Sequence, residues 1–126
     1  MTSIVICIIT YKRPESLACT LQSLAALQLP EEIRVRFVVV DNDVEQSARD
    51  VVNDSTLLIE YVVEEKKGIP HARNRALQIV VHDDYIAFAD DDDVVEPQWI
   101  SALYTAAIKY QAEVVKGQVV YTFDDD

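Results

Sequence analysis

The chain has 126 residues, of which half are hydrophobic and only two are glycine. This length and composition fit one globular domain with a buried core and exclude a disordered chain. The formal net charge of −11 argues against non-specific binding to nucleic acid or to an anionic membrane.

The N-terminal apolar segment, residues 4–9, is too short for a signal peptide and lacks a basic leader. No apolar run approaches the length that spans a membrane. We therefore expect a cytoplasmic protein, with the cytoplasmic face of a membrane as the alternative for a longer parent protein. Cys7 and Cys19 are both expected to be reduced and buried.

Strands and helices are predicted to alternate along the chain. Residues 4–9 form a continuous apolar run, which is typical of a strand buried on both faces of a parallel sheet. Pro14 suits the first turn of the helix that follows. Further strands are predicted at 35–40, 57–63, 85–89 and 113–123, and further helices at 45–52, after Gly68 and after Pro97. This order predicts a Rossmann-like α/β fold with a doubly wound, mainly parallel sheet.

Polar residues follow three of the predicted strands. Thr10 and Tyr11 follow the first strand, Asp41-Asn42-Asp43 follows the second, and four consecutive aspartates, residues 90–93, follow the fourth. Because the carboxyl ends of parallel strands meet at one edge, where ligands bind, we expect these side chains to border one crevice. Such a crevice fits a nucleotide, since Tyr11 can stack on a base and Asp41 can accept a hydrogen bond from a base or ribose.

The four aspartates raise one another's pKa values unless a positive partner holds them. A divalent cation is the simplest partner, because hard cations prefer carboxylate oxygens, and such an ion can bridge phosphates. An acidic turn before a helix would explain one or two of these aspartates but not all four.

The helix that opens at Gly68 adds the positive end of its dipole to this edge. Within it, Arg73 is predicted at the border of the apolar face, toward the sheet, whereas Arg75 points to solvent. Taken alone, Arg73 fits equally well as a surface arginine lying over the sheet. The apolar face itself is expected to comprise Ala72, Ala76, Leu77 and Val80.

Residues 10–14 contain no glycine, so neither a dinucleotide-binding fingerprint nor a P-loop follows the first strand. Zinc-ligand spacing and a Ser-His-Asp order are also absent from the sequence. These absences exclude the common dehydrogenases and P-loop ATPases and leave a nucleotide-binding fold that holds phosphates through a metal.

Four segments together resemble the N-terminal half of the family 2 glycosyltransferases, which have the GT-A fold. They are IVICIITYKRP (4–14), FVVVDND (37–43), GIPHARNRAL (68–77) and YIAFADDDDVVEP (85–97). The segments run in the family's order and span nearly the whole chain. The resemblance implies a nucleoside diphosphate sugar donor, most often uridine-linked, a carbohydrate or lipid-linked acceptor, and inversion at the anomeric carbon.

The resemblance also implies roles for residues near the nucleoside. Tyr11 would lie against the base, with Thr10 beside it among the nucleotide-binding candidates. Asp41 would bind the base, and Asp43 would take the place of the family's second acidic residue near the nucleoside. Arg73 would line the donor pocket.

In the same way, Asp90 and Asp92 match the family's DxD motif. Asp92 would coordinate Mg2+ or Mn2+ on the diphosphate, and Asp90 would contact the ribose or a water on the metal. Asp91 and Asp93 stand outside the two matched positions of the motif, and Asp91 is a further nucleotide-binding candidate.

The family's catalytic base is a carboxylate in a later segment, and no candidate for it follows Asp93. We therefore expect residues 1–126 to be the nucleotide-sugar-binding part of a longer protein, with the acceptor-binding part missing. Such a part would bind donor and metal but transfer sugar poorly. Two alternatives remain, a non-catalytic nucleotide-sugar-binding module and a metal-dependent nucleotidyltransferase, although the latter usually has a basic glycine-rich loop that this sequence lacks.

Overall fold

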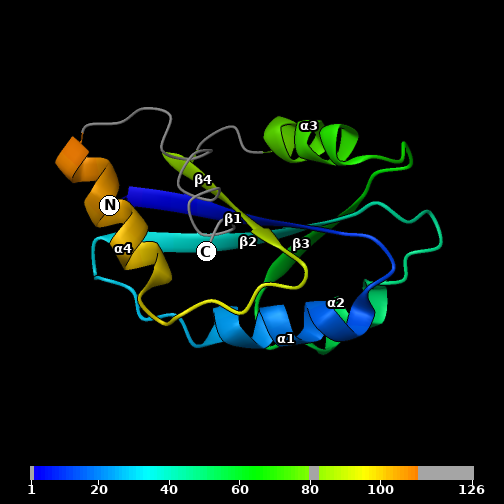
Figure 1. Ribbon diagram of the computed structural model, residues 1–126, viewed down its shortest axis with the longest axis horizontal. Helices are drawn as coiled ribbons and strands as arrows, with labels where there is room; N and C mark the ends of the chain where they lie inside the picture. The colour runs from blue at the N-terminus through cyan, green and yellow to red at the C-terminus, as the bar shows by residue number, and fades with distance from the viewer. Residues whose placement is uncertain (1, 80–82, 111–126) are drawn as a thin grey trace.

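The computed structural model describes residues 2–79 and 83–110, in which strands and helices alternate (Figure 1). The predicted strand at 113–123 and the predicted apolar contact of Val80 lie outside these ranges. The elements, in chain order, are β1 (Thr2–Thr10), α1 (Pro14–Ala25), β2 (Ile33–Asp41), α2 (Arg49–Asp54), β3 (Ile59–Val63), α3 (Ile69–Ile79), β4 (Tyr85–Asp90) and α4 (Trp99–Tyr110).

The strands form one parallel sheet in the order β3-β2-β1-β4. The chain runs outward from β1 through β2 to β3 and then crosses back to place β4 on the other side of β1. This reversal makes the sheet doubly wound, as the sequence predicted. The register pairs Thr10 of β1 with Asp41 of β2, and Ile9 of β1 with Asp90 of β4, so the three strands end side by side.

Helices cover both faces of the sheet, with α3 on one face and α1, α2 and α4 on the other (Figure 1). Successive residues of β1 alternate between the two cores. Ile4, Ile6 and Ile8 pack with α1 and α4, whereas Val5 and Cys7 pack with α3. This alternation explains why β1 reads as a continuous apolar run. Among the described helices, none is long and apolar enough to cross a membrane.

Two predictions of burial were wrong. Leu77 is 51% exposed, because α3 approaches the sheet through a stripe of small residues, Ala72 and Ala76, that is too narrow to include it. Cys19 is exposed on α1, whereas Cys7 is buried as predicted; both thiols are free.

The helix predicted at 45–52 begins later, at Arg49. The segment before it makes turns instead, because the carboxylate of Asp43 accepts a hydrogen bond of 3.0 Å from the amide of Glu45. Gln46 also adopts a left-handed backbone with φ of 60°, which ends any helix there. The chain thus forms a compact loop, residues 42–48, at the end of β2.

Candidate functional site

A pocket of about 310 Å³ opens at the carboxyl edge of the sheet, between the ends of β1 and β4 and the start of α3. It lies where the strand order reverses, which is where open α/β sheets bind ligands. Of the predicted site residues, its lining includes Thr10, Tyr11, Arg73, Asp90, Asp91 and Asp92. The prediction that the strand ends would border one crevice therefore holds for β1 and β4, whereas the end of β2 contributes Asn42 to the lining but neither Asp41 nor Asp43.

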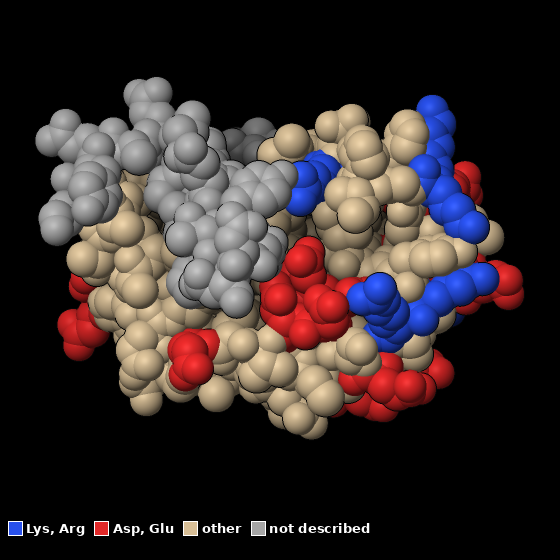
Figure 2. Space-filling model, viewed as in Figure 1, with Lys and Arg blue, Asp and Glu red and all other residues tan. Residues whose placement is uncertain are grey.

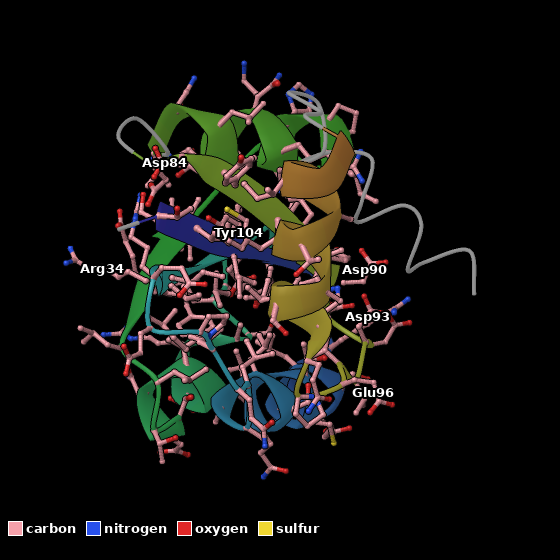
Figure 3. All side chains as sticks on the ribbon, turned by 90° about the vertical axis from the view of Figure 1, so that its left-hand side faces the viewer. Arg34, Asp84, Asp90, Asp93, Glu96 and Tyr104 are labelled. Carbon is pink, nitrogen blue, oxygen red and sulfur yellow. The ribbon has the colours of Figure 1, made fainter. Side chains whose placement is uncertain are left out.

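The acidic cluster lies at one side of this pocket. Asp90 ends β4, and Asp90, Asp92 and Asp93 each bring a carboxylate oxygen within 4.8 Å of the others. Acidic side chains gather in the middle of this face beside basic ones (Figure 2), and Asp90 and Asp93 project on the same side of the molecule (Figure 3). Three hard oxygen donors at this spacing fit Mg2+ or Mn2+.

The electrostatics of the cluster favour a cation as well. Burial raises the pKa of Asp90, and the neighbouring carboxylates of Asp93, Asp92 and Asp91 raise it further, while Arg73 opposes the shift. The raised pKa means that the negative charge on Asp90 is disfavoured unless a positive group approaches.

Asp91 differs from its three neighbours because its side chain turns inward. The whole residue is 7% exposed, and its Oδ2 accepts a hydrogen bond of 2.9 Å from the hydroxyl of Thr10. Its other oxygen lies 3.5 Å from Nη1 of Arg13, at the start of α1. Asp91 therefore joins the ends of β1 and β4, and Asp90 and Asp92 on either side of it line the pocket.

Basic side chains also lie at the pocket and around the ring of Tyr11. Tyr11 is 36% exposed, and its ring lies beneath two ammonium groups, with Nζ of Lys67 at 4.9 Å and Nζ of Lys12 at 5.4 Å from the ring centroid. A hydrogen bond from Lys67 lowers the pKa of Tyr11. The half-buried Arg73 places its guanidinium carbon 5.6 Å from the ring centroid of Phe88, which also lines the pocket. An acidic chain thus presents local positive charge where an anionic ligand would enter.

Asp41 lies behind the pocket wall. It is fully buried, with Oδ1 accepting a hydrogen bond of 3.0 Å from the amide of Asp43. Its Oδ2 accepts bonds from the amide of Ala48 at 3.0 Å and from the hydroxyl of Tyr61 at 2.6 Å. Asp41 therefore shapes the 42–48 loop, and direct contact between its carboxylate and a base stays a prediction.

Asp43 is also buried, at 5% exposure, and is not among the residues that line the described pocket. The amide of Glu45 lowers the pKa of Asp43 by donating a hydrogen bond to it. Its predicted place near the nucleoside likewise stays a prediction.

Asn42 was missed as a site residue. Its Nδ2 donates hydrogen bonds of 2.9 Å to the carbonyls of Glu64 and Lys66, and its Oδ1 accepts one of 2.9 Å from the amide of Gly68. One side chain thus fixes the loop between β3 and α3. Within that loop Gly68 has φ of 125°, a backbone conformation that is strained for any residue with a Cβ atom. Its position between two aspartates at a strand end was the available signal.

Arg13 was also missed, although it follows β1 directly. Its Nη1 lies 3.4 Å from Oδ2 of Asp92, in addition to its contact with Asp91. It lines the pocket together with Asn42.

Comparisons with known proteins agree with this geometry. Residues 5–126 match the family model described as glycosyl transferase family 2. The chain is 42% identical over 114 residues to the succinoglycan biosynthesis protein ExoM of Rhizobium meliloti (strain 1021), which covers 87% of this chain and 36% of that protein.

Solved structures show the same fold. TarS 1–349 of S. aureus in complex with UDP matches with a TM-score of 0.73 and 23% identity, over 88% of this chain and 33% of that one. Mannosyltransferase PcManGT from Pyrobaculum calidifontis, in complex with GDP-Man and Mn2+, matches with a TM-score of 0.69 and 18% identity, over 80% of this chain and 31% of that one. The chain spans about a third of the length of these relatives. Its sheet has the GT-A architecture, and the chain belongs to glycosyl transferase family 2.

Proposed function

We propose that this chain is the donor-binding part of an inverting glycosyltransferase, which moves a sugar from a UDP-linked donor to an acceptor hydroxyl. The observation that carries the proposal is one pocket lined by the ring of Tyr11, by basic side chains and by Asp90 and Asp92, two of the three clustered carboxylates. The UDP complex of TarS and the GDP-Man and Mn2+ complex of PcManGT support it, because both share this fold.

Each side of the pocket suits a different part of the donor. The exposed ring of Tyr11 offers a surface for the base, and the loop held by Asp41 and Asp43 backs that surface. Arg73 offers a positive charge for the diphosphate. The oxygens of Asp90, Asp92 and Asp93 would hold Mg2+ or Mn2+. When bound, such an ion supplies Lewis-acid stabilisation of the charge on the departing diphosphate.

The role of the outer carboxylates differs from that of Asp91. Because Asp91 is committed to Thr10 and Arg13, its contribution to the donor is indirect, through the position of the turn after β4. Thr10 acts in the same indirect way. The aspartates on either side of Asp91 then carry the metal, in agreement with the DxD spacing.

The experiment is a calorimetric titration of the chain with UDP, with Mn2+ and with the chelator EDTA. We expect UDP affinity to fall by about tenfold or more when the metal is removed, because two ligands that share a site commonly change each other's affinity by that much. Asp92→Asn should cause the same loss, whereas Asp50→Asn, an exposed aspartate on α2, should bind UDP like the wild type. Parallel titrations with GDP and CDP identify the base.

Two results would refute the proposal. The first is an absence of UDP, GDP and CDP binding at millimolar concentration in a folded sample. The second is nucleotide binding that neither Mn2+ nor Asp92→Asn changes.

A further inference from the structure

Arg13 holds an unusual place beside the acidic cluster. A single nitrogen, Nη1, lies 3.5 Å from Oδ1 of Asp91 and 3.4 Å from Oδ2 of Asp92. The two carboxylates differ, since the side chain of Asp91 is 10% exposed and that of Asp92 is 57% exposed. One guanidinium therefore bridges an inner carboxylate that is fixed and an outer one that is free to move.

The inner contact anchors Arg13. Asp91 is held by its 2.9 Å hydrogen bond from Thr10, so its position is set by the sheet. The backbone also brings Arg13 close, because Lys12 takes a left-handed conformation with φ of 54° in the tight turn between β1 and α1. A non-glycine residue adopts that conformation only where the surroundings impose it. Arg13 thus stays near the cluster even when its contact with Asp92 opens.

The outer contact competes with a metal. Asp92 shares one cluster with Asp90 and Asp93, and its carboxylate also faces the positive Arg13. A carboxylate paired with a guanidinium is a poorer ligand, because the metal must first displace that cation. The guanidinium of Arg13, 3.4 Å from the carboxylate of Asp92, also repels a divalent ion bound to that carboxylate.

We propose that Arg13 is a built-in counter-ion of the metal site. Without ligands it neutralises Asp92, and when a divalent cation and a nucleoside diphosphate enter together it leaves Asp92 and pairs with the diphosphate. The metal alone therefore binds weakly, and metal and nucleotide strengthen each other's binding. This inference rests on the proposed donor-binding function and adds a diphosphate-contacting residue to it.

The first test measures Mn2+ binding to the 126-residue chain by electron paramagnetic resonance, without nucleotide. Arg13→Ala should bind Mn2+ about two- to fivefold more tightly than the wild type, which is the range expected for losing a partly exposed ion pair. Arg13→Lys keeps the charge but loses the guanidinium, and should fall between the two. Circular dichroism verifies that each variant is folded.

Two controls separate the contact from general charge effects. Lys12→Ala removes the same charge from the adjacent residue, whose Nζ lies over Tyr11, and should tighten Mn2+ binding less than Arg13→Ala does. Arg34→Ala removes it from the opposite side of the molecule to Asp90 and Asp93 (Figure 3) and should leave Mn2+ binding unchanged.

The second test measures UDP binding at saturating Mn2+. Arg13→Ala should weaken it, so that one substitution moves metal and nucleotide affinity in opposite directions. The inference is overturned if Arg13→Ala leaves Mn2+ binding unchanged or weakens it, or if Lys12→Ala tightens it equally. If any of these results is obtained and the wild type still binds UDP with Mn2+, the role of Arg13 is wrong but the proposed donor-binding function stands. If no variant binds UDP, the proposed function fails and the pairing with diphosphate fails with it.

Discussion

The hydroxyl of Tyr61 donates a hydrogen bond of 2.6 Å to Oδ2 of Asp41, between the neighbouring strands β3 and β2. The same oxygen accepts a hydrogen bond from the amide of Ala48, so Asp41 links β3 to the loop that leads into α2. Burial raises the pKa of Tyr61, and the bond to Asp41 raises it further. This contact is therefore a structural support beneath the predicted nucleoside side of the pocket.

Tyr61→Phe tests how much that support contributes. The substitution removes one donor to a buried carboxylate and leaves the ring in place, so the free energy of unfolding should fall by about 1–3 kcal/mol. Urea unfolding measures the change. Tyr104→Phe is the matched control, since its hydroxyl makes a longer, 3.3 Å contact with Oγ1 of Thr2 and should cost less. Equal losses in the two variants would contradict a special role for Tyr61.

Asn42→Asp tests the clamp on the loop between β3 and α3. The new carboxylate would face the carbonyls of Glu64 and Lys66 in place of an NH2 donor, so the loop should loosen. We expect the amide of Gly68 to exchange its hydrogen about tenfold faster or more, equivalent to at least ~1.4 kcal/mol of lost protection. Hydrogen exchange followed by NMR reads this amide directly.

A control for Asn42→Asp is available on α2. Asn53→Asp makes the same chemical change at an exposed position and should leave the exchange of Gly68 unaltered. If Asn42→Asp also leaves it unaltered, the three hydrogen bonds of Asn42 do not hold the loop.

Asp91→Asn and Asp93→Asn should have opposite profiles despite being the same chemical change two residues apart. Asp91 is buried against Thr10, so its substitution should lower the free energy of unfolding by about 1–3 kcal/mol. Asp93 belongs to the outer carboxylates, so its substitution should chiefly weaken Mn2+ binding. Thermal melts with and without Mn2+ separate the effects, and a dominant loss of Mn2+ binding in Asp91→Asn would contradict the inward assignment.

The sequence was enough to predict the four described strands and the edge of the sheet where their polar residues meet. Continuous apolar runs identify strands buried on both faces, and parallel pairing then brings residues 10–11 and 90–92 together whatever their separation along the chain. The half-buried position of Arg73 at the border of the apolar face and the exposure of Arg75 also followed from helical spacing.

What the sequence could not predict lies in the turns. Beyond the last residue of a strand, side-chain alternation stops applying, so the inward direction of Asp91 depends on its hydrogen bond from Thr10. At the last residue of β2, the way in which Asp41 is held depends on the hydrogen bond from Tyr61. Those partners lie 81 and 20 residues away. The late start of α2 has the same origin, because the turns in the 42–48 loop compete with helix formation.

The buried thiol of Cys7 makes the stability of the fold depend on alkaline pH. Burial raises the pKa of Cys7 from 9.0 to about 12. The unfolded chain therefore loses this proton above pH 9 while the folded chain keeps it, so the stabilisation is complete below pH 9 and declines as pH rises toward 12. The expected slope is about 1.4 kcal/mol per pH unit.

Urea unfolding of the wild type and of Cys7→Ala at several pH values above 9 tests this slope. Cys7→Ala should be less stable near pH 9, because it leaves a small cavity, but its stability should decline less steeply as the pH rises. Cys19→Ala is the control, since it removes an exposed thiol and leaves Cys7 in place. The raised pKa of Tyr61 adds a further decline above pH 10 in all three proteins alike, so the difference between the two cysteine variants isolates Cys7. Parallel slopes in wild type and Cys7→Ala would mean that the thiol does not titrate on unfolding.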